Sequence, residues 1–155
     1  MGLARKIDNN IEPLRRISNR ALSPLLDLAI RLYMAYTFFV SGKSKLDTYL
    51  NDDWESTVFL FEEVHPVPFI PADAAAIAGT AGEVILPILL ALGLFGRFAA
   101  AGLLIMTAVI QFGVPADYGL MNTVHYLWML LLAVPLIKGP GPISLDYLVL
   151  KFIRK

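Results

Sequence analysis

The sequence predicts an all-α, polytopic membrane protein: a four-helix bundle with a structured extracytoplasmic loop between its first two helices. Hydrophobic residues make up 57% of the 155 positions, more than the roughly 45–50% of soluble domains. Charged residues make up 17%, below the usual level of about 25%, and they gather in the connections between apolar runs. A chain of this length is expected to form a single membrane domain, residues 1–155.

Four apolar segments are long enough to cross a bilayer. A hydrocarbon core about 30 Å thick requires a helix of roughly 20 residues, within a range of about 17–25. The predicted transmembrane helices cover about residues 24–42, 72–95, 98–114 and 120–137.

The predicted outer loop, residues 43–71, is too long for a simple turn. Residues 54–64 can form a short amphipathic helix, whereas the three prolines between His65 and Pro71 favour an extended path. We interpret this loop as a lid over the outer mouth of the bundle. A passive loop held down by its aromatic side chains is the alternative.

Short interfacial helices are expected at both termini. The first 23 residues mix apolar and basic side chains, which favours a helix on an anionic lipid surface, although a solvated tail fits as well. Near the other end, Gly139-Pro140-Gly141-Pro142 stops the last span. Ser144 or Asp146 can then cap a short helix over residues 145–155.

The distribution of lysine and arginine predicts that both termini are cytoplasmic. Basic residues are enriched on the cytoplasmic side of membrane proteins. With four crossings, one side holds ten of them: Arg5, Lys6, Arg15, Arg16, Arg20, Arg97, Lys138, Lys151, Arg154 and Lys155. The opposite side holds Lys43 and Lys45 among many acidic residues.

Ionisable residues inside the spans are the candidates for function, because each costs on the order of 3 kcal/mol near the bilayer centre. Asp27 and Arg31 are four residues apart in the favourable order for a structural ion pair. Glu83 lies midway along the second span. Pro87 lies four residues later and deprives the Glu83 carbonyl of its helical donor.

Side-chain direction groups several polar residues into one predicted pocket. Side chains lean toward the N-terminus of their own helix, so polar groups from antiparallel spans converge in the outer half of the bundle. The pocket has polar members and aromatic walls: Lys43, Glu83, Gln111 and His125, with Tyr36, Phe39 and Trp128. The alternative is that Glu83 and His125 only hold helices together.

Several chemistries are not expected. The chain has no cysteine, so it has no thiol chemistry, disulfide or iron–sulfur cluster of its own. One histidine and one glutamate in the predicted pocket fall short of a closed metal site, even with His65. A net charge of zero and the absence of a basic stripe argue against nucleic acid. We expect no intrinsic cofactor.

Three motifs in order resemble the DoxX family. The first is Arg31-Leu32 followed by Phe38-Phe39-Val40-Ser41-Gly42-Lys43-Ser44-Lys45-Leu46. The second runs from Gly82-Glu83 through Pro87 to Leu92-Gly93-Leu94-Phe95-Gly96-Arg97. The third is His125-Tyr126-Leu127-Trp128 with Gly139-Pro140-Gly141-Pro142-Ile143-Ser144-Leu145-Asp146.

The resemblance implies a multi-pass protein of the bacterial inner membrane that is associated with redox systems, either quinone-linked oxidoreductases or enzymes of the oxidative-stress response. Three functions remain open: a membrane subunit or accessory that binds a quinone, a scaffold or assembly partner, and a carrier of a small ligand or ion. Whether the chain is an enzyme by itself stays open too. The expected partners are the lipid bilayer, a soluble or membrane redox protein, and a second copy in a homo-oligomer.

Overall fold

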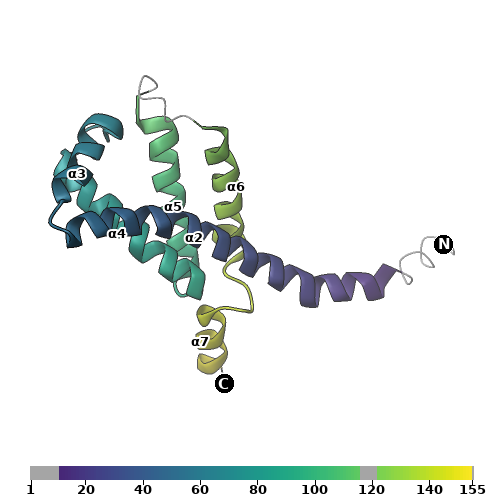
Figure 1. The fold of residues 1–155 in the computed structure, drawn as a ribbon. Coiled ribbons are helices and arrows are strands. Elements are labelled where there is room, and N and C mark those ends of the chain that lie inside the picture. Colours follow the sequence, from purple (N-terminus) through teal and green to yellow (C-terminus); the bar gives the residue numbers. More distant parts are fainter. Residues whose placement is uncertain (1–10, 116–121, 155) are drawn as a thin grey trace.

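A computed structural model of the chain describes residues 11–115 and 122–154. Within these ranges every regular element is helical. Figure 1 shows the longer helices together, with the small lobe that contains α3 (Trp54–Phe59) and the C-terminal helix α7 (Leu145–Ile153) at separate ends of the molecule. The longer helices are α2 (Ser23–Leu50), α4 (Ala72–Leu92), α5 (Gly96–Ala108) and α6 (Thr123–Lys138).

The first long helix extends past both predicted ends. Helix α2 continues to Leu50, eight residues beyond the predicted end at Gly42, because neither glycine nor proline interrupts residues 43–50. Toward the N-terminus, the helix is continuous from Ile11 through the π-helical turn η1 (Ser18–Leu22). Forty residues rise about 60 Å, so the first part extends away from the other helices (Figure 1). The described part of the predicted N-terminal interfacial helix is therefore continuous with the first span, and residues 1–10 lie outside the description.

The connection between α2 and α4 is shorter than predicted and partly helical. It contains α3 (Trp54–Phe59) and the π-helical turn η2 (Leu60–Val64), which together form the lid, with residues 65–71 completing it in a non-helical path. The lid folds back onto α2 and α4. The hydroxyl groups of Thr48 and Thr57 lie 2.7 Å apart, and the rings of Tyr49 and Trp54 meet edge to face.

The remaining boundaries differ from the predictions by a few residues. Helix α4 begins at Ala72 and ends at Leu92, where Gly93 adopts a left-handed conformation that reverses the chain. Helix α5 begins at Gly96 and continues as the π-helical turn η3 (Val109–Gly113). Residues 120 and 121 of the predicted fourth span lie outside the description, and α6 begins at Thr123.

Three of the described helices are long and apolar enough to cross a membrane: Ile11–Leu50, Ala72–Leu92 and Gly96–Gly113. Thr123–Lys138 is apolar but has 16 residues, slightly fewer than the range of about 17–25 for a span. The chain is therefore an all-helical membrane protein with three candidate spans in its described part.

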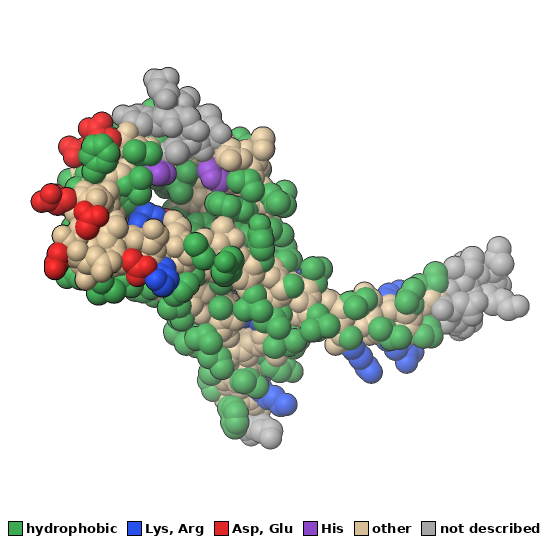
Figure 2. Space-filling model, in the orientation of Figure 1, with side chains coloured by type: hydrophobic (Ala, Val, Ile, Leu, Met, Phe, Trp, Pro, Cys, Tyr) green, Lys and Arg blue, Asp and Glu red, His purple; other side chains and the backbone are tan. Residues whose placement is uncertain are grey.

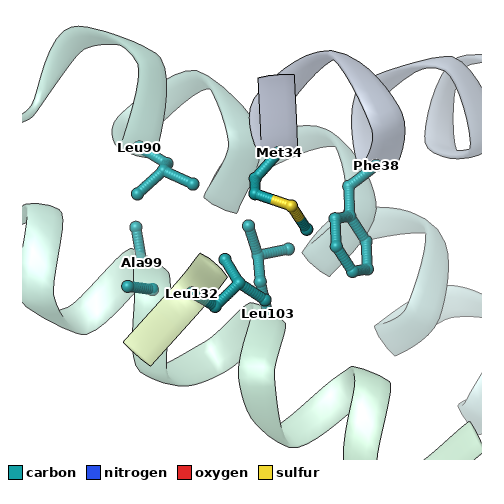
Figure 3. Close-up of a cluster of buried hydrophobic side chains, with 7 residues drawn as sticks. Met34, Phe38, Leu90, Ala99, Leu103 and Leu132 are labelled. Carbon is teal, nitrogen blue, oxygen red and sulfur yellow. The ribbon is translucent and has the colours of Figure 1, made fainter. Parts of the chain in front are cut away.

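The core lies where α2, α4, α5 and α6 meet. Figure 3 shows Met34 and Phe38 from α2 facing Leu90 from α4, Ala99 and Leu103 from α5, and Leu132 from α6. The small side chains of Ala99 and Ala100 are fully buried and allow α5 to pack closely. Helix α5 packs on both α4 and α6, and α6 also contacts α2.

Arg31 joins the helix ends on the side of the core opposite the lid. Its buried guanidinium donates from Nη1 to the carbonyls of Leu90 (3.1 Å) and Ala91 (3.0 Å), and from Nη2 to the carbonyl of Ile143. The last carbonyls of a helix lack intrahelical donors, so this cation caps the C-terminus of α4.

The turn between α4 and α5 is capped from the C-terminal segment. The Asp146 carboxylate accepts hydrogen bonds from the backbone N–H groups of Phe95 and Gly96, both at 2.9 Å. The hydroxyl of Ser144 caps the C-terminal helix α7 (Leu145–Ile153) by accepting from the N–H of Tyr147. Of the two predicted cap residues, Ser144 caps α7, and Asp146 caps the neighbouring turn.

We expect Arg31→Met to destabilise the protein strongly. The substitution keeps apolar bulk but leaves the carbonyls of Ala91 and Ile143 without the Arg31 donor, at about 1–3 kcal/mol each, whereas the Leu90 carbonyl still accepts from the N–H of Gly93. A total loss of about 3 kcal/mol would lower the thermal midpoint by ~6 °C or more in a chain of this size. Thermal unfolding in mild detergent measures the change.

Arg97→Met is the matched control. The Arg97 side chain is exposed and donates one bond, to the carbonyl of Ile137 (3.2 Å). If the two variants lose equal stability, the bonds from Arg31 to the buried carbonyls do not stabilise the protein more than an exposed hydrogen bond does.

Candidate functional site

The candidate site is an open cavity of about 720 Å³ between the lid, α2, α4 and α5. A volume of this size is typical of small-molecule sites. Figure 2 shows the molecule hollowed between the lobe that contains α3 and the end of α5, with basic and histidine side chains near the hollow. The lining is mostly apolar, with five polar or charged members: Ser41, Ser44, Lys45, His65 and Glu83.

A close crossing of α2 and α4 forms the floor of the cavity. A Cβ atom added to Gly42 would lie 2.6 Å from the backbone carbon and oxygen of Glu83, which is too close for any side chain. Gly42 therefore lets α2 cross α4 directly at Glu83. This Glu83 carbonyl is also the one that Pro87, inside α4, deprives of its helical donor.

The crossing places Lys45 one turn beyond Gly42, against the Glu83 side chain. Lys45 Nζ lies 2.6 Å from Glu83 Oε2 and 2.8 Å from the hydroxyl of Ser41. The Lys45 and Glu83 side chains are 12% and 8% exposed. A carboxylate and an ammonium ion thus face an apolar chamber as a paired, largely desolvated unit.

The lid is fixed over the cavity by an aromatic contact. The ring of Phe61 lies on Gly79, where an added Cβ would come within 2.6 Å of the ring. His65 follows η2 in the lid and also lines the cavity. Its Nδ1 is buried without a hydrogen-bond partner among the described residues. Burial lowers the pKa of His65, the nearby Lys45 ammonium lowers it further, and the Leu60 carbonyl and Glu83 partly oppose both.

Gln111 and His125 form a separate polar cluster. His125 Nδ1 lies 2.8 Å from Gln111 Oε1, which also accepts from the N–H of Asn122 (3.1 Å). The His125 ring contacts Trp128, and Trp128 packs against Phe38. The π-helical turn η3 carries Gln111, which is buried. The structure brings Gln111, His125 and Trp128 together, but none of them lines the cavity that Glu83 faces.

Three other predicted pocket members lie elsewhere. Lys43 is exposed and pairs with Asp47 along α2 (2.5 Å), since it points away from the face that crosses α4. Tyr36 and Phe39 are exposed on the outer face of α2, where they border a shallow groove beside Pro87. The aromatic wall of the cavity comes from Phe61 instead.

Asp27 and Arg31 each bind other partners instead of forming the ion pair predicted between them. The Asp27 carboxylate binds Lys138 at 2.7 and 3.0 Å, and Arg31 donates to the backbone carbonyls described above. Both side chains are buried, but the ends of α4 and α6 supply them with other partners. Among the described residues, no group of three or more metal-ligating side chains is found.

Lys45 was missed as a pocket residue, although the sequence contains a signal for it. The buried positions of α2 include Asp27, Arg31, Met34, Phe38 and Gly42, at spacings of three or four. Lys45 continues this series and Lys43 does not, so Lys45 shares the inward face once the helix is extended beyond Gly42.

Comparison with known proteins identifies the family of the chain. A family model described as DoxX matches residues 26–116, which contain most of α2, the lid, α4 and α5. The chain belongs to the DoxX family. Its first two sequence motifs lie wholly inside the match, and the third lies beyond it.

A relative extends the similarity along the chain. This DoxX protein is 30% identical over 131 residues to a protein of Haemophilus influenzae described as an uncharacterized protein. The similarity covers 80% of this chain and 83% of the relative. No solved structure matches.

We expect removal of one member of the buried pair to cost far more stability than removal of both. Glu83→Gln leaves an ammonium ion desolvated, and breaking a buried pair in this way costs about 3–5 kcal/mol. The double variant Lys45→Met with Glu83→Gln should recover much of this loss. Thermal unfolding of the two single variants and the double variant gives the coupling energy.

Lys43→Met provides the comparison on the same helix. The Lys43 and Asp47 side chains are 60% and 45% exposed, and exposed pairs contribute about 0–1 kcal/mol. Additive effects of Lys45→Met and Glu83→Gln would contradict a coupled pair.

The lowered pKa of His65 predicts a lid that loosens in acid. In an open lid, His65 would regain its ordinary pKa of about 6.5, so the open state binds more protons between that value and the lower closed-state pKa. The contribution of His65 to closure is therefore complete above pH ~6.5 and falls as the pH drops.

Because the chain has no cysteine, thiol labelling can measure this opening. A cysteine in place of Val67 (Val67→Cys), in the cavity wall, reacts faster when the lid opens. A cysteine in place of Phe69 (Phe69→Cys), at a fully exposed position of the same loop, reacts at a rate that depends only on the reagent and on thiol ionisation. The ratio of the two labelling rates therefore measures opening of the lid. The labelling ratio should rise from about pH 7.5 to about pH 5.5 and should stay flat in His65→Asn. A flat ratio in the parent chain would rule out this role for His65.

Proposed function

We propose that this DoxX protein binds an amphipathic redox molecule of the quinone class in the cavity under the lid, as a membrane subunit or accessory of a redox system. The observation that carries the proposal is the buried Lys45–Glu83 pair in a mostly apolar cavity of about 720 Å³. The resemblance of the sequence motifs to a family associated with redox systems is the reason for proposing a redox molecule as the ligand.

The chemistry of the pair suits a quinone head. An ammonium group has three donors, and Lys45 uses two of them on Ser41 and Glu83. The third can donate to a ring carbonyl. When a partner protein supplies two electrons, the ring oxygens take up two protons. The Lys45 ammonium group can pass a proton to the adjacent oxygen as a general acid, and the Glu83 carboxylate can relay the proton that restores it. Our proposal assigns binding and proton handling to this chain and places the electron donor in a partner protein, soluble or membrane-bound.

The proposal includes a four-span topology in the bacterial inner membrane with both termini in the cytoplasm. Arg97 follows the C-terminus of α4, and Lys138, at the end of α6, binds Asp27 near the start of α2. The lid joins the end of α2 to the start of α4, so these basic residues and the lid lie at opposite ends of the helices, which supports this orientation. As a fourth span, α6 rises about 24 Å, so it would need adjoining residues or local thinning of the bilayer.

Titration with a short-chain quinone tests the proposal. Full-length protein in mild detergent should show a saturable rise in thermal midpoint, because a ligand that binds the folded state stabilises it. Lipid extracts of the purified protein should contain quinone. Lys45→Met should weaken binding about tenfold, the effect of one lost hydrogen bond of ~1.4 kcal/mol.

Lys43→Met should leave quinone affinity unchanged, because Lys43 lies outside the cavity. Absence of quinone from the extracts, together with no saturable binding and no effect of Glu83→Gln, would contradict the proposal. The scaffold function, in which the lid docks a partner protein, would then be the better account.

A further inference from the structure

The mouth of the cavity is apolar and exposed. Val40, Ile70 and Ile105 line the cavity and also reach the surface, at 50%, 49% and 61% exposure. They come from α2, the lid and α5, so the opening lies between the lid and the transmembrane helices. Apolar side chains at an open rim fit contact with lipid chains better than contact with water.

The charged groups in the wall cancel one another. Lys45 and Glu83 are 2.6 Å apart and together contribute no net charge. An anionic head that reaches Lys45 would also meet the Glu83 carboxylate, and a cationic head at Glu83 would meet the ammonium group. Each case places an unpaired charge in an apolar chamber, which is costly.

An uncharged polar head meets no such penalty. A hydroxyl or carbonyl oxygen can accept from the remaining Lys45 donor, and a hydroxyl can also donate to Glu83. Met106, Val109 and Ile110 continue the apolar lining along α5 and η3, where a hydrocarbon chain can lie.

We propose that the cavity is filled sideways from the bilayer and selects amphiphiles with an uncharged, oxygen-bearing head over those with an ionic head. This inference rests on the proposed function, since it assumes that the cavity binds an amphiphile. It adds the route by which the amphiphile enters and the property by which the Lys45–Glu83 pair selects it, the charge of the head group.

Photolabelling with matched probes tests the selection. Three probes share one alkyl chain with a diazirine, and they carry a hydroxyl, a sulfonate or a trimethylammonium head, whose charges do not change with pH. The full-length chain is placed in phosphatidylcholine vesicles, irradiated and mapped by peptide mass spectrometry. The hydroxyl probe should label residues 105–110 about tenfold more than either ionic probe, a difference of ~1.4 kcal/mol.

Charge variants should change the preference in a defined direction. Glu83→Gln leaves Lys45 unpaired and should favour the sulfonate probe, and Lys45→Gln should favour the trimethylammonium probe. If these variants do not fold, Ser44→Lys and Ser44→Asp at the exposed edge of the same wall should produce the same two shifts. Lys43→Gln should change nothing, because Lys43 is outside the cavity.

The route of entry has its own pair of variants. Ile105→Trp should slow labelling by narrowing the mouth, whereas Ile77→Trp, on an exposed part of α4 outside the lining, should not. Equal labelling by the three probes, or a probe preference that is the same in the charge variants, would overturn the proposed selection by head-group charge. An unchanged rate in Ile105→Trp would overturn the lateral route. No labelling of the cavity by any probe would instead contradict the proposed function itself.

Discussion

The close crossing of α2 over α4 at Gly42 and Glu83 is the constraint on which the rest of the site depends. Any side chain at position 42 would collide with the Glu83 backbone, so the two helices meet only because this residue is glycine. The crossing fixes Lys45 against the Glu83 carboxylate. It also sets where α2 leaves the bundle and therefore where the lid folds back. The charged pair and the lid thus both follow from one contact.

The two ends of the helices are stabilised by different means. On one side, Arg31 and Asp146 satisfy backbone groups at the turn between α4 and α5, in a dense arrangement of buried hydrogen bonds. On the other, the lid rests on the ring contacts of Trp54 with Tyr49 and of Phe61 with Gly79, and on a pair of hydroxyl groups, beside an open cavity. Regions with few buried contacts open at lower free-energy cost. This asymmetry suits a protein with a fixed base and a ligand site under a movable cover.

The buried polar residues separate into groups with distinct roles. Lys45 and Glu83 face the cavity, Gln111 and His125 join η3 to the start of α6, and Asp27 and Arg31 hold the opposite end. A polar side chain in an apolar interior needs a hydrogen-bond or ion-pair partner within reach. Each group therefore pairs with the nearest side chain or with the backbone groups at the nearest helix end. Of these groups, the first lines the cavity of about 720 Å³.

The sequence by itself determined the membrane class, the approximate helical segments and the need for Glu83 to have a partner, because apolar length and the cost of a buried charge are local properties of the chain. Side-chain direction grouped Gln111, His125 and Trp128 with Glu83 in one predicted pocket, whereas in the structure these three residues form a cluster away from the cavity that Glu83 lines. Tertiary structure decided that Lys45 rather than Lys43 meets Glu83, and that Arg31 caps α4 rather than pairing with Asp27. Those choices depend on where α2 crosses α4 and on which distant carbonyls lie within reach, and helical spacing within one segment does not specify either.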